Sequence, residues 1–167
     1  MEQLWSPWRS TYIASTAERS ADECFLCAAA LELDDPQSVL VVARFPSTIV
    51  VLNRYPYNAG HLLIAPIEHV AGLTSLSADA AHELMDVTQI ALRILENELH
   101  PHGVNVGANL GAAAGAGVPG HLHIHIVPRW NGDTNFMPVI GEVKVVSESL
   151  LDMWSKFSVA FREAVSV

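Results

Sequence analysis

The stretch His-Leu-His-Ile-His-Ile-Val at residues 121–127 constrains the fold of this chain most strongly. Polar and apolar residues alternate strictly in it, and successive side chains of a β-strand point to opposite faces. The pattern predicts a strand with one aliphatic face on a core and three imidazoles about 7 Å apart on the other face. Alone, it is equally compatible with a metal-binding strand or an accidental run of histidines.

Residues 103–120 precede this strand and hold six of the ten glycines of the chain. Glycine lets the backbone approach a ligand closely, and consecutive backbone N–H groups can form a concave anion site. The segment has no G-x-x-x-x-G-K-[ST] pattern and runs into a strand rather than a helix, so neither a P-loop nor a dinucleotide-binding turn is expected. In isolation it would be interpreted as a flexible linker. Beside three histidines, it is interpreted as a phosphate-binding loop.

The composition narrows the function classes. The chain has 167 residues, 50% of them hydrophobic, which predicts a single globular domain with a substantial core. Its net charge of −9 disfavours nucleic acid as a partner. No apolar run reaches the ~20 residues of a transmembrane helix and no secretory signal is visible, so no membrane partner is expected. Two cysteines are too few for a disulfide framework, which favours the cytoplasm.

The arrangement of periodic segments predicts an α+β fold. Apolar runs bounded by turn residues predict strands at 39–44, 48–53 and 61–67. A long helix is expected to begin after the N-cap Ser77 and to end before Pro101. A strand at 103–109 should pair antiparallel with the histidine strand, and an amphipathic helix is expected at about 148–165. One long helix interrupts the strands without regular β-α alternation, so a mainly antiparallel sheet of about five strands is favoured.

Three segments together resemble the histidine triad (HIT) nucleotide-binding proteins, whose signature is His-x-His-x-His followed by two apolar residues. They are HLHIHIV, VLNRYPYNAGHLLIAPIEH (51–69) and NLGAAAGAGVPGHLHIHIVPRWNGDTNFMPVIG (109–141). The tail PRWNGDTNFMPVIG (128–141) and LWSPWRSTYI (4–13) are most similar to the bacterial branch that contains diadenosine tetraphosphate phosphorylases. The resemblance implies a HIT-like fold, an adenine nucleotide substrate and a homodimer that joins two sheets. We divide the chain into an N-terminal arm (1–22), a HIT domain (23–145) and a packed C-terminal helix (146–167).

The chemistry of the triad points to nucleotidyl transfer. A neutral imidazole can attack the α-phosphorus of a phosphoanhydride and form a labile nucleotidyl-histidine. His123 is the geometric choice for the nucleophile because it lies between the other two histidines. We expect a backbone carbonyl to hold a proton on its Nδ1, so that Nε2 can attack. The resemblance implies that His125 contacts the phosphate and leaving group, and that His61 supports the triad by hydrogen bonds.

The resemblance also implies the nucleotide contacts. It implies that Asn53 hydrogen-bonds the ribose hydroxyls and that Asn109 lies near the transferred phosphate. Many relatives carry a side-chain hydroxyl or amide just before the triad, where this chain offers only backbone donors near Gly117 and Val118. Arg129 or water is therefore expected to protonate the leaving group.

A second constellation predicts a metal site. Cys24-x-x-Cys27 supplies two thiolates at zinc-ligand spacing, although two half-buried thiols would show the same pattern. The resemblance implies His69 and His121 as the other ligands. Four protein ligands leave no open position, so this zinc would be structural. Magnesium is expected only as a companion of a polyphosphate substrate.

We therefore predict a nucleotidyl transferase or hydrolase that cleaves adenosine polyphosphates at the α-phosphate, with diadenosine tetraphosphate favoured and phosphate or water as acceptor. Three alternatives stay open: an adenosine phosphoramidase using the same His123, a nucleotide-binding regulatory HIT protein with little turnover, and a zinc-dependent structural module.

Overall fold

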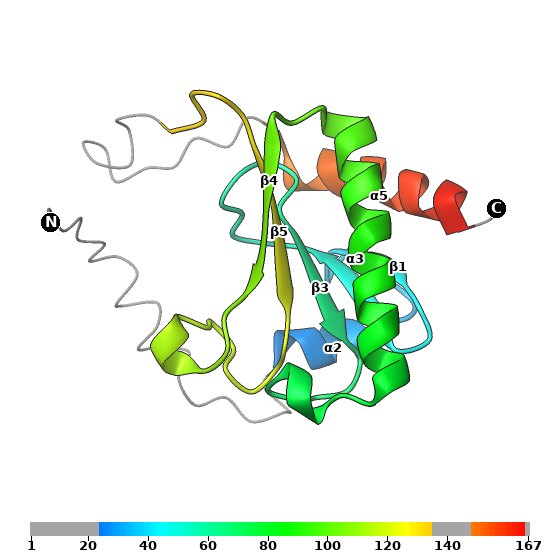
Figure 1. The fold of residues 1–167 in the computed structure, drawn as a ribbon. Coiled ribbons are helices and arrows are strands. Elements are labelled where there is room, and N and C mark those ends of the chain that lie inside the picture. Colours follow the sequence, from blue (N-terminus) through cyan, green and yellow to red (C-terminus); the bar gives the residue numbers. More distant parts are fainter. Residues whose placement is uncertain (1–23, 135–147, 166–167) are drawn as a thin grey trace, which may run out of the picture.

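The computed structural model describes residues 24–134 and 148–165, and within them it confirms the predicted α+β fold (Figure 1). Five antiparallel strands form one sheet in the order β1-β2-β3-β5-β4. The strands are β1 (Val41–Arg44), β2 (Thr48–Leu52), β3 (Leu62–Pro66), β4 (Gly103–Ala108) and β5 (Ile124–Arg129). The α-helices are α2 (Phe25–Leu31), α3 (Ala78–Leu99) and α5 (Leu150–Val165), and the short 3-10 helices are η2 (Leu73–Ser75) and η3 (Ala112–Ala114).

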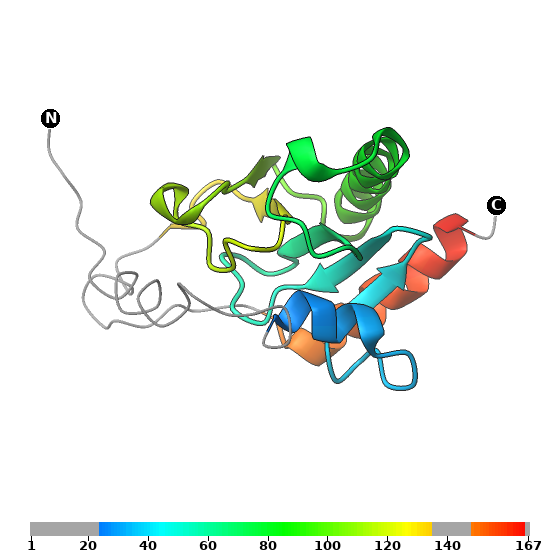
Figure 2. The ribbon, with the colours of Figure 1, turned by 90° about the horizontal axis from the view of Figure 1, so that it is seen from below.

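The helices and the glycine-rich loop lie on different sides of the molecule. Helix α3 contacts β2, β3 and β5, and helix α5 contacts both α3 and β1. In Figures 1 and 2, α3 and α5 lie on one side of β4 and β5, and the loop with η3 lies on the other. The glycine-rich loop and the long helices thus approach β4 and β5 from different sides.

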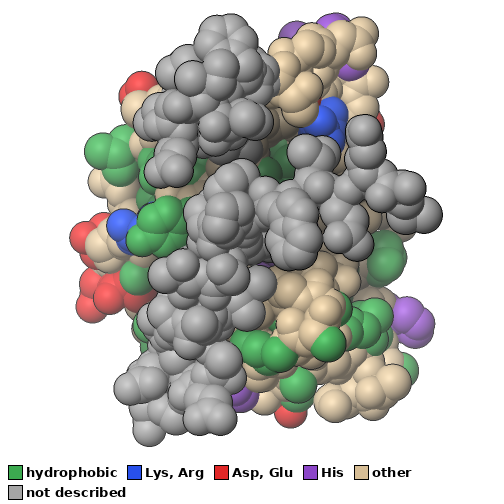
Figure 3. All heavy atoms as spheres, turned by 90° about the vertical axis from the view of Figure 1, so that its left-hand side faces the viewer, with side chains coloured by type: hydrophobic (Ala, Val, Ile, Leu, Met, Phe, Trp, Pro, Cys, Tyr) green, Lys and Arg blue, Asp and Glu red, His purple; other side chains and the backbone are tan. Residues whose placement is uncertain are grey.

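The surface agrees with an acidic protein. On the face shown in Figure 3, the Lys and Arg side chains that are visible stand apart from one another and form no patch. Within residues 24–134 and 148–165, no helix combines the length and apolar character needed to cross a membrane.

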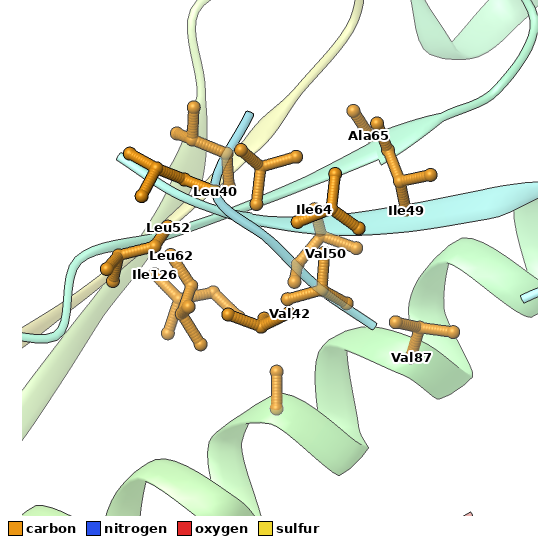
Figure 4. Packing of buried hydrophobic residues seen from close by; sticks show 14 of the residues in the cluster. Leu40, Val42, Ile49, Val50, Leu52, Leu62, Ile64, Ala65, Val87 and Ile126 are labelled. Carbon is orange, nitrogen blue, oxygen red and sulfur yellow. The ribbon is translucent and has the colours of Figure 1, made fainter. Parts of the chain in front are cut away.

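The core forms between the sheet and the two long helices. Every residue of β2 and β3 is buried, and Figure 4 shows Val87 of α3 facing the side chains of β2. Helix α3 buries the predicted stripe, which comprises Leu84, Val87, Ala91, Ile94 and Leu95. The hydroxyl of Ser77 accepts the backbone N–H of Ala80, which confirms the predicted N-cap. The next apolar layer comes from α5, whose buried residues Met153, Phe157 and Phe161 recur every four residues.

Two local predictions were incomplete. Helix α2 was not predicted, because seven residues are too few to reveal a helical period. The histidine strand pairs only from Ile124, whereas the sequence pattern predicted a strand from His121. The β3–β5 register would place Leu122 opposite Pro66, which has no N–H to donate, and the N–H of Leu122 donates instead to the Val70 carbonyl.

The proposed domain boundaries stay predictions. The C-terminal helix packs on the domain as expected, and the indole N–H of Trp154 donates to the Val41 carbonyl at 2.8 Å. The N-terminal arm at 1–22 and most of the connection before α5 lie outside the described residues.

Candidate active site and metal centre

The fold brings His61 and His125 together across two neighbouring strands. His61 directly precedes β3, His125 lies in β5, and the antiparallel register pairs Leu63 with His125. As a result, Nε2 of His61 lies 3.0 Å from Nδ1 of His125. His61 is fully buried and His125 is partly buried, so the pair runs from the interior toward the surface.

The neighbours of His61 determine where its proton resides. The backbone N–H of Tyr57 can only donate, and it lies 3.1 Å from Nδ1 of His61. Nδ2 of Asn53 lies 3.2 Å from the same nitrogen, and its orientation is set because Oδ1 of Asn53 accepts the N–H of Tyr55. Nδ1 of His61 is therefore an acceptor, so the proton of the neutral ring lies on Nε2 and is donated to Nδ1 of His125. A neutral His125 must then carry its own proton on Nε2.

His123 has the opposite arrangement. Its Nδ1 lies 2.8 Å from the carbonyl oxygen of His121, which can only accept. The ring proton therefore lies on Nδ1, as predicted, and Nε2 has a free lone pair. Burial lowers the pKa of His123 because desolvation disfavours the imidazolium form. The ring is thus kept neutral, which is the nucleophilic form.

The two rings are adjacent. The centroids of His123 and His125 lie 4.9 Å apart with the ring planes at 69°. A nitrogen with a free lone pair and a ring N–H donor therefore lie side by side at the start of β5. The ring of His121 does not join this pair, because its Nδ1 faces the two cysteines.

The glycine-rich loop leads directly into the triad. Gly111 and Gly115 adopt φ values of +80° and +84°, which favour glycine. Nδ2 of Asn109 lies 3.4 Å from the Gly115 carbonyl, which closes the loop on itself. Within the described part of the chain, the backbone N–H groups of Gly117 and Val118 have no hydrogen-bond acceptor. These two amides are available to an anion.

Arg129 forms an ion pair near the end of β5. Its Nε and Nη2 contact the two carboxylate oxygens of Asp133 at 2.6 and 2.8 Å, and its Nη1 donates to Oδ1 of Asn105. Four residues along a strand span about 13 Å, so Arg129 lies far from His125. This ion pair argues against Arg129 as the proton donor, and the expectation that Arg129 or water protonates the leaving group stays a prediction.

The four predicted metal ligands form one cluster. The ligand atoms of Cys24, Cys27, His69 and His121 all lie within 4.8 Å of one another. Nδ1 of His121 lies 3.3 Å from Sγ of Cys24 and 3.4 Å from Sγ of Cys27. Nδ1 of His69 lies 3.1 Å from Sγ of Cys27. Tetrahedral zinc with ordinary bond lengths separates neighbouring sulfur and nitrogen ligands by about 3.5 Å. The donor set and its spacing therefore fit zinc.

Surrounding groups favour the metal-binding forms of His121 and Cys24. Nε2 of His121 lies 2.8 Å from the Pro66 carbonyl, which holds a proton there and leaves Nδ1 free to face the thiols. Burial raises the pKa of the Cys24 thiol, but the hydrogen bond with His121, its charge and the backbone hydrogen bonds of Cys27 and Leu26 together outweigh burial, and the pKa is lowered to about 6. Cys24 thus favours the thiolate, which is the metal-binding form. A Cβ on Gly120 would lie 3.2 Å from Nε2 of His69, so glycine lets the loop pass closely.

Comparisons with known proteins agree with the geometry. The sequence matches the HIT domain over residues 36–132. It is also 42% identical to the AP-4-A phosphorylase of Mycobacterium tuberculosis over 157 residues, covering 91% of this chain and 80% of that protein. The chain belongs to the HIT domain family. The resemblance to HIT proteins and the bacterial branch predicted from residues 4–13 and 128–141 are both confirmed.

Other HIT proteins match over different lengths. The bis(5'-adenosyl)-triphosphatase of Saccharomyces cerevisiae is 32% identical over 84 residues, covering 50% of this chain and 40% of that protein. Among solved structures, a Zn-bound histidine triad family protein from Mycobacterium smegmatis shares the fold, with a TM-score of 0.69 and 23% identity over 88% of this chain and 99% of that one. A histidine triad nucleotide-binding protein from Sulfolobus tokodaii gives a TM-score of 0.64 at 25% identity, covering 86% of this chain and 92% of that one.

Sequence reasoning missed one residue of this HIT site. The ring centroid of Tyr57 lies 4.7 Å from that of His61 and 5.9 Å from that of His125. No periodic pattern marks Tyr57, because a turn rather than a strand or helix brings it to the histidines.

Proposed function

We propose that this HIT protein is an enzyme that cleaves adenosine polyphosphates at the α-phosphorus through a nucleotidyl-His123 intermediate, with diadenosine tetraphosphate as the favoured substrate. One observation carries the proposal. The free Nε2 of His123 and the Nε2–H of His125 belong to rings whose centroids are 4.9 Å apart. The name and 42% identity of the mycobacterial AP-4-A phosphorylase support the same substrate class.

The first step breaks one P–O bond and forms one P–N bond. Nε2 of His123 attacks the α-phosphorus, and the electron pair of the broken bond stays on the departing nucleotide, which is ATP for diadenosine tetraphosphate. The imidazole becomes cationic, and the His121 carbonyl bonded to its Nδ1–H stabilises that charge. Nε2–H of His125 donates a hydrogen bond to the departing oxygen.

The second step restores the enzyme. Inorganic phosphate or water attacks the same phosphorus, the P–N bond breaks, and His123 returns to its neutral form. Phosphate as acceptor yields ADP, whereas water yields AMP and releases a proton. No proton has to leave through Arg129, in keeping with its ion pair at the other end of β5.

The glycine-rich loop is proposed to bind the substrate phosphates. The unpaired amides of Gly117 and Val118 would donate to phosphoryl oxygens, and the Asn109 amide would contact the transferred phosphate. The ribose contact of Asn53 stays a prediction, since its amide already contacts His61 and the Tyr55 backbone.

We propose zinc as the occupant of the Cys24, Cys27, His69 and His121 cluster. The metal would be structural and would tie the start of α2 to the segments after β3 and before β5. Magnesium is proposed only as a counterion carried by the polyphosphate.

The enzyme is proposed to be a cytoplasmic homodimer. Strand β4 forms an edge of the sheet and Val106 on it is 49% exposed, so a second copy can pair there. Reduced cysteines used as metal ligands suit the cytoplasm. The net charge of −9 supports the absence of nucleic acid and anionic membrane surfaces as partners.

Product analysis tests the proposal. Diadenosine tetraphosphate is incubated with the protein, with and without inorganic phosphate, and the nucleotides are separated. ADP with ATP indicates phosphorolysis, and AMP with ATP indicates hydrolysis. His123→Ala should abolish both, while His102→Ala at an exposed position serves as the matched control. Turnover by His123→Ala, or failure of mass spectrometry to find a nucleotidyl adduct on wild-type His123, would contradict the mechanism.

The phosphoramidase alternative is tested in the same assay. Adenosine 5'-phosphoramidate replaces the dinucleotide, and a larger kcat/KM for it than for any adenosine polyphosphate would favour P–N cleavage. Nucleotide binding without turnover of either substrate would favour a regulatory role.

A further inference from the structure

Tyr57 contacts both histidines of the hydrogen-bonded pair. Its ring is tilted by 42° against His61 at 4.7 Å and stacks within 18° of parallel on His125 at 5.9 Å. It is 44% exposed, so one part of the ring reaches the surface while another part packs against the two imidazoles. Aromatic contacts at these separations have orientation preferences that restrict ring rotation.

The backbone of Tyr57 acts on the same pair. Its N–H donates to Nδ1 of His61, so the His61 proton lies on Nε2. That proton points toward Nδ1 of His125. The next residue anchors the turn, because Nδ2 of Asn58 donates to the Pro128 carbonyl and to Oδ2 of Asp133. Tyr57 is thus held on a turn that is tied to the end of β5.

We propose that Tyr57 is a positioning residue that holds the His61–His125 pair so that Nε2–H of His125 meets the departing oxygen of the substrate. The inference rests on the proposed function. The hydrogen bond from His61 and the edge contact with His123 act on the ring of His125, and the Tyr57 ring adds a stacking contact on its face. Rotation of the His125 ring out of that plane would move its N–H away from the leaving group.

The contribution of a hydrogen-bond donor depends on the leaving group. A basic leaving oxygen needs the donor strongly, whereas an acidic one leaves nearly as well without it. The phenyl ester of AMP expels a phenol with a pKa of about 10, like that of tyrosine. The p-nitrophenyl ester expels a much more acidic phenol. Both esters form the same nucleotidyl-His123 intermediate, so kcat/KM reports the step in which the phenol departs. The ratio of kcat/KM values for the two esters therefore reports on the alignment of His125.

The test compares Tyr57→Leu, Tyr57→Phe and the wild type on both esters. Tyr57→Leu should lower kcat/KM about tenfold or more for the phenyl ester and less than about threefold for the p-nitrophenyl ester. Tyr57→Phe keeps the ring and should stay within about twofold on both. Arg54→Ala, at an exposed position of the same turn, is the matched control. Circular dichroism and thermal unfolding check that each variant folds.

The outcomes separate this inference from the proposed function. An equal loss on both esters, or no loss on either, would overturn the positioning role of Tyr57. If Tyr57→Leu does not fold, Tyr57→Gln removes the ring and keeps a polar side chain at this exposed position, and an unchanged ester ratio in it would also overturn the role. His125→Ala should reproduce the larger loss for the phenyl ester. If His125→Ala shows this difference between the esters and Tyr57→Leu does not, only the inference about Tyr57 is refuted. Turnover by His123→Ala refutes the proposed function, and the inference with it.

Discussion

Replacing His61 tests the proton arrangement of the site most directly. His61→Leu removes the ring that donates to Nδ1 of His125 and keeps an apolar side chain in a fully buried position. Nδ1 of His125 then loses its donor, and the N–H of Tyr57 and Nδ2 of Asn53 lose their acceptor. Each buried group left without a partner costs about 1–3 kcal/mol, so His61→Leu should unfold at a lower urea concentration than the wild type.

The effect on catalysis follows from the proton on His125. Without the His61 donor, the neutral ring of His125 can hold its proton on either nitrogen. The lost hydrogen bond, with a net contribution of about 1 kcal/mol, no longer stabilises the tautomer that has its proton on Nε2. Misplacement of a catalytic group by about 1 Å costs on the order of 100-fold. We therefore expect kcat for the phenyl ester of AMP to fall roughly 10- to 100-fold, with KM nearly unchanged.

A rescue variant makes the result specific. In His61→Gln, the side-chain amide can donate to His125, so it should recover most of the lost kcat. Both variants are assayed under saturating ester, and urea unfolding confirms that the protein is folded at the assay temperature. A His61→Leu variant that is folded and keeps kcat within about twofold of the wild type would refute the arrangement of protons inferred here.

Three further predictions concern the metal, the turn before His61 and the acid limit of stability. Cys27→Ser should lose the bound metal and unfold at a lower temperature, and a metal-free wild type in elemental analysis would rule out the site. Gly60 has a φ of +79°, so Gly60→Ala should cost about 1–2 kcal/mol in urea unfolding, whereas Gly72→Ala, which meets no atom within 4 Å, should cost much less. Hydrogen bonding from Arg129 holds the pKa of Asp133 well below its usual range. That contribution to stability is present above the unfolded pKa of about 3.9 and is lost as the pH falls below it. The stability difference between wild type and Asp133→Asn should therefore shrink on acidification, and a difference independent of pH would contradict the ion pair.

The sequence pattern was sufficient for the elements whose burial is periodic. The stripe of helix α3 and its Ser77 cap were predicted, because both depend on residues three or four positions apart. The β-strands were predicted to within a few residues from their apolar runs. The cysteine spacing and the resemblance together named all four members of the metal cluster.

By itself, then, the sequence determined the family, the segment that bears His123 and His125, and the residue types able to do the chemistry. Only the tertiary structure decided which nitrogens face one another: the register of β3 on β5 sets His61 against His125, and the turn at Tyr57 orients their protons. The physical reason is distance along the chain. Alternation and helical period report only on near neighbours, whereas the direction of a hydrogen bond between His61 and His125 depends on strand pairing and on a turn that no local pattern specifies.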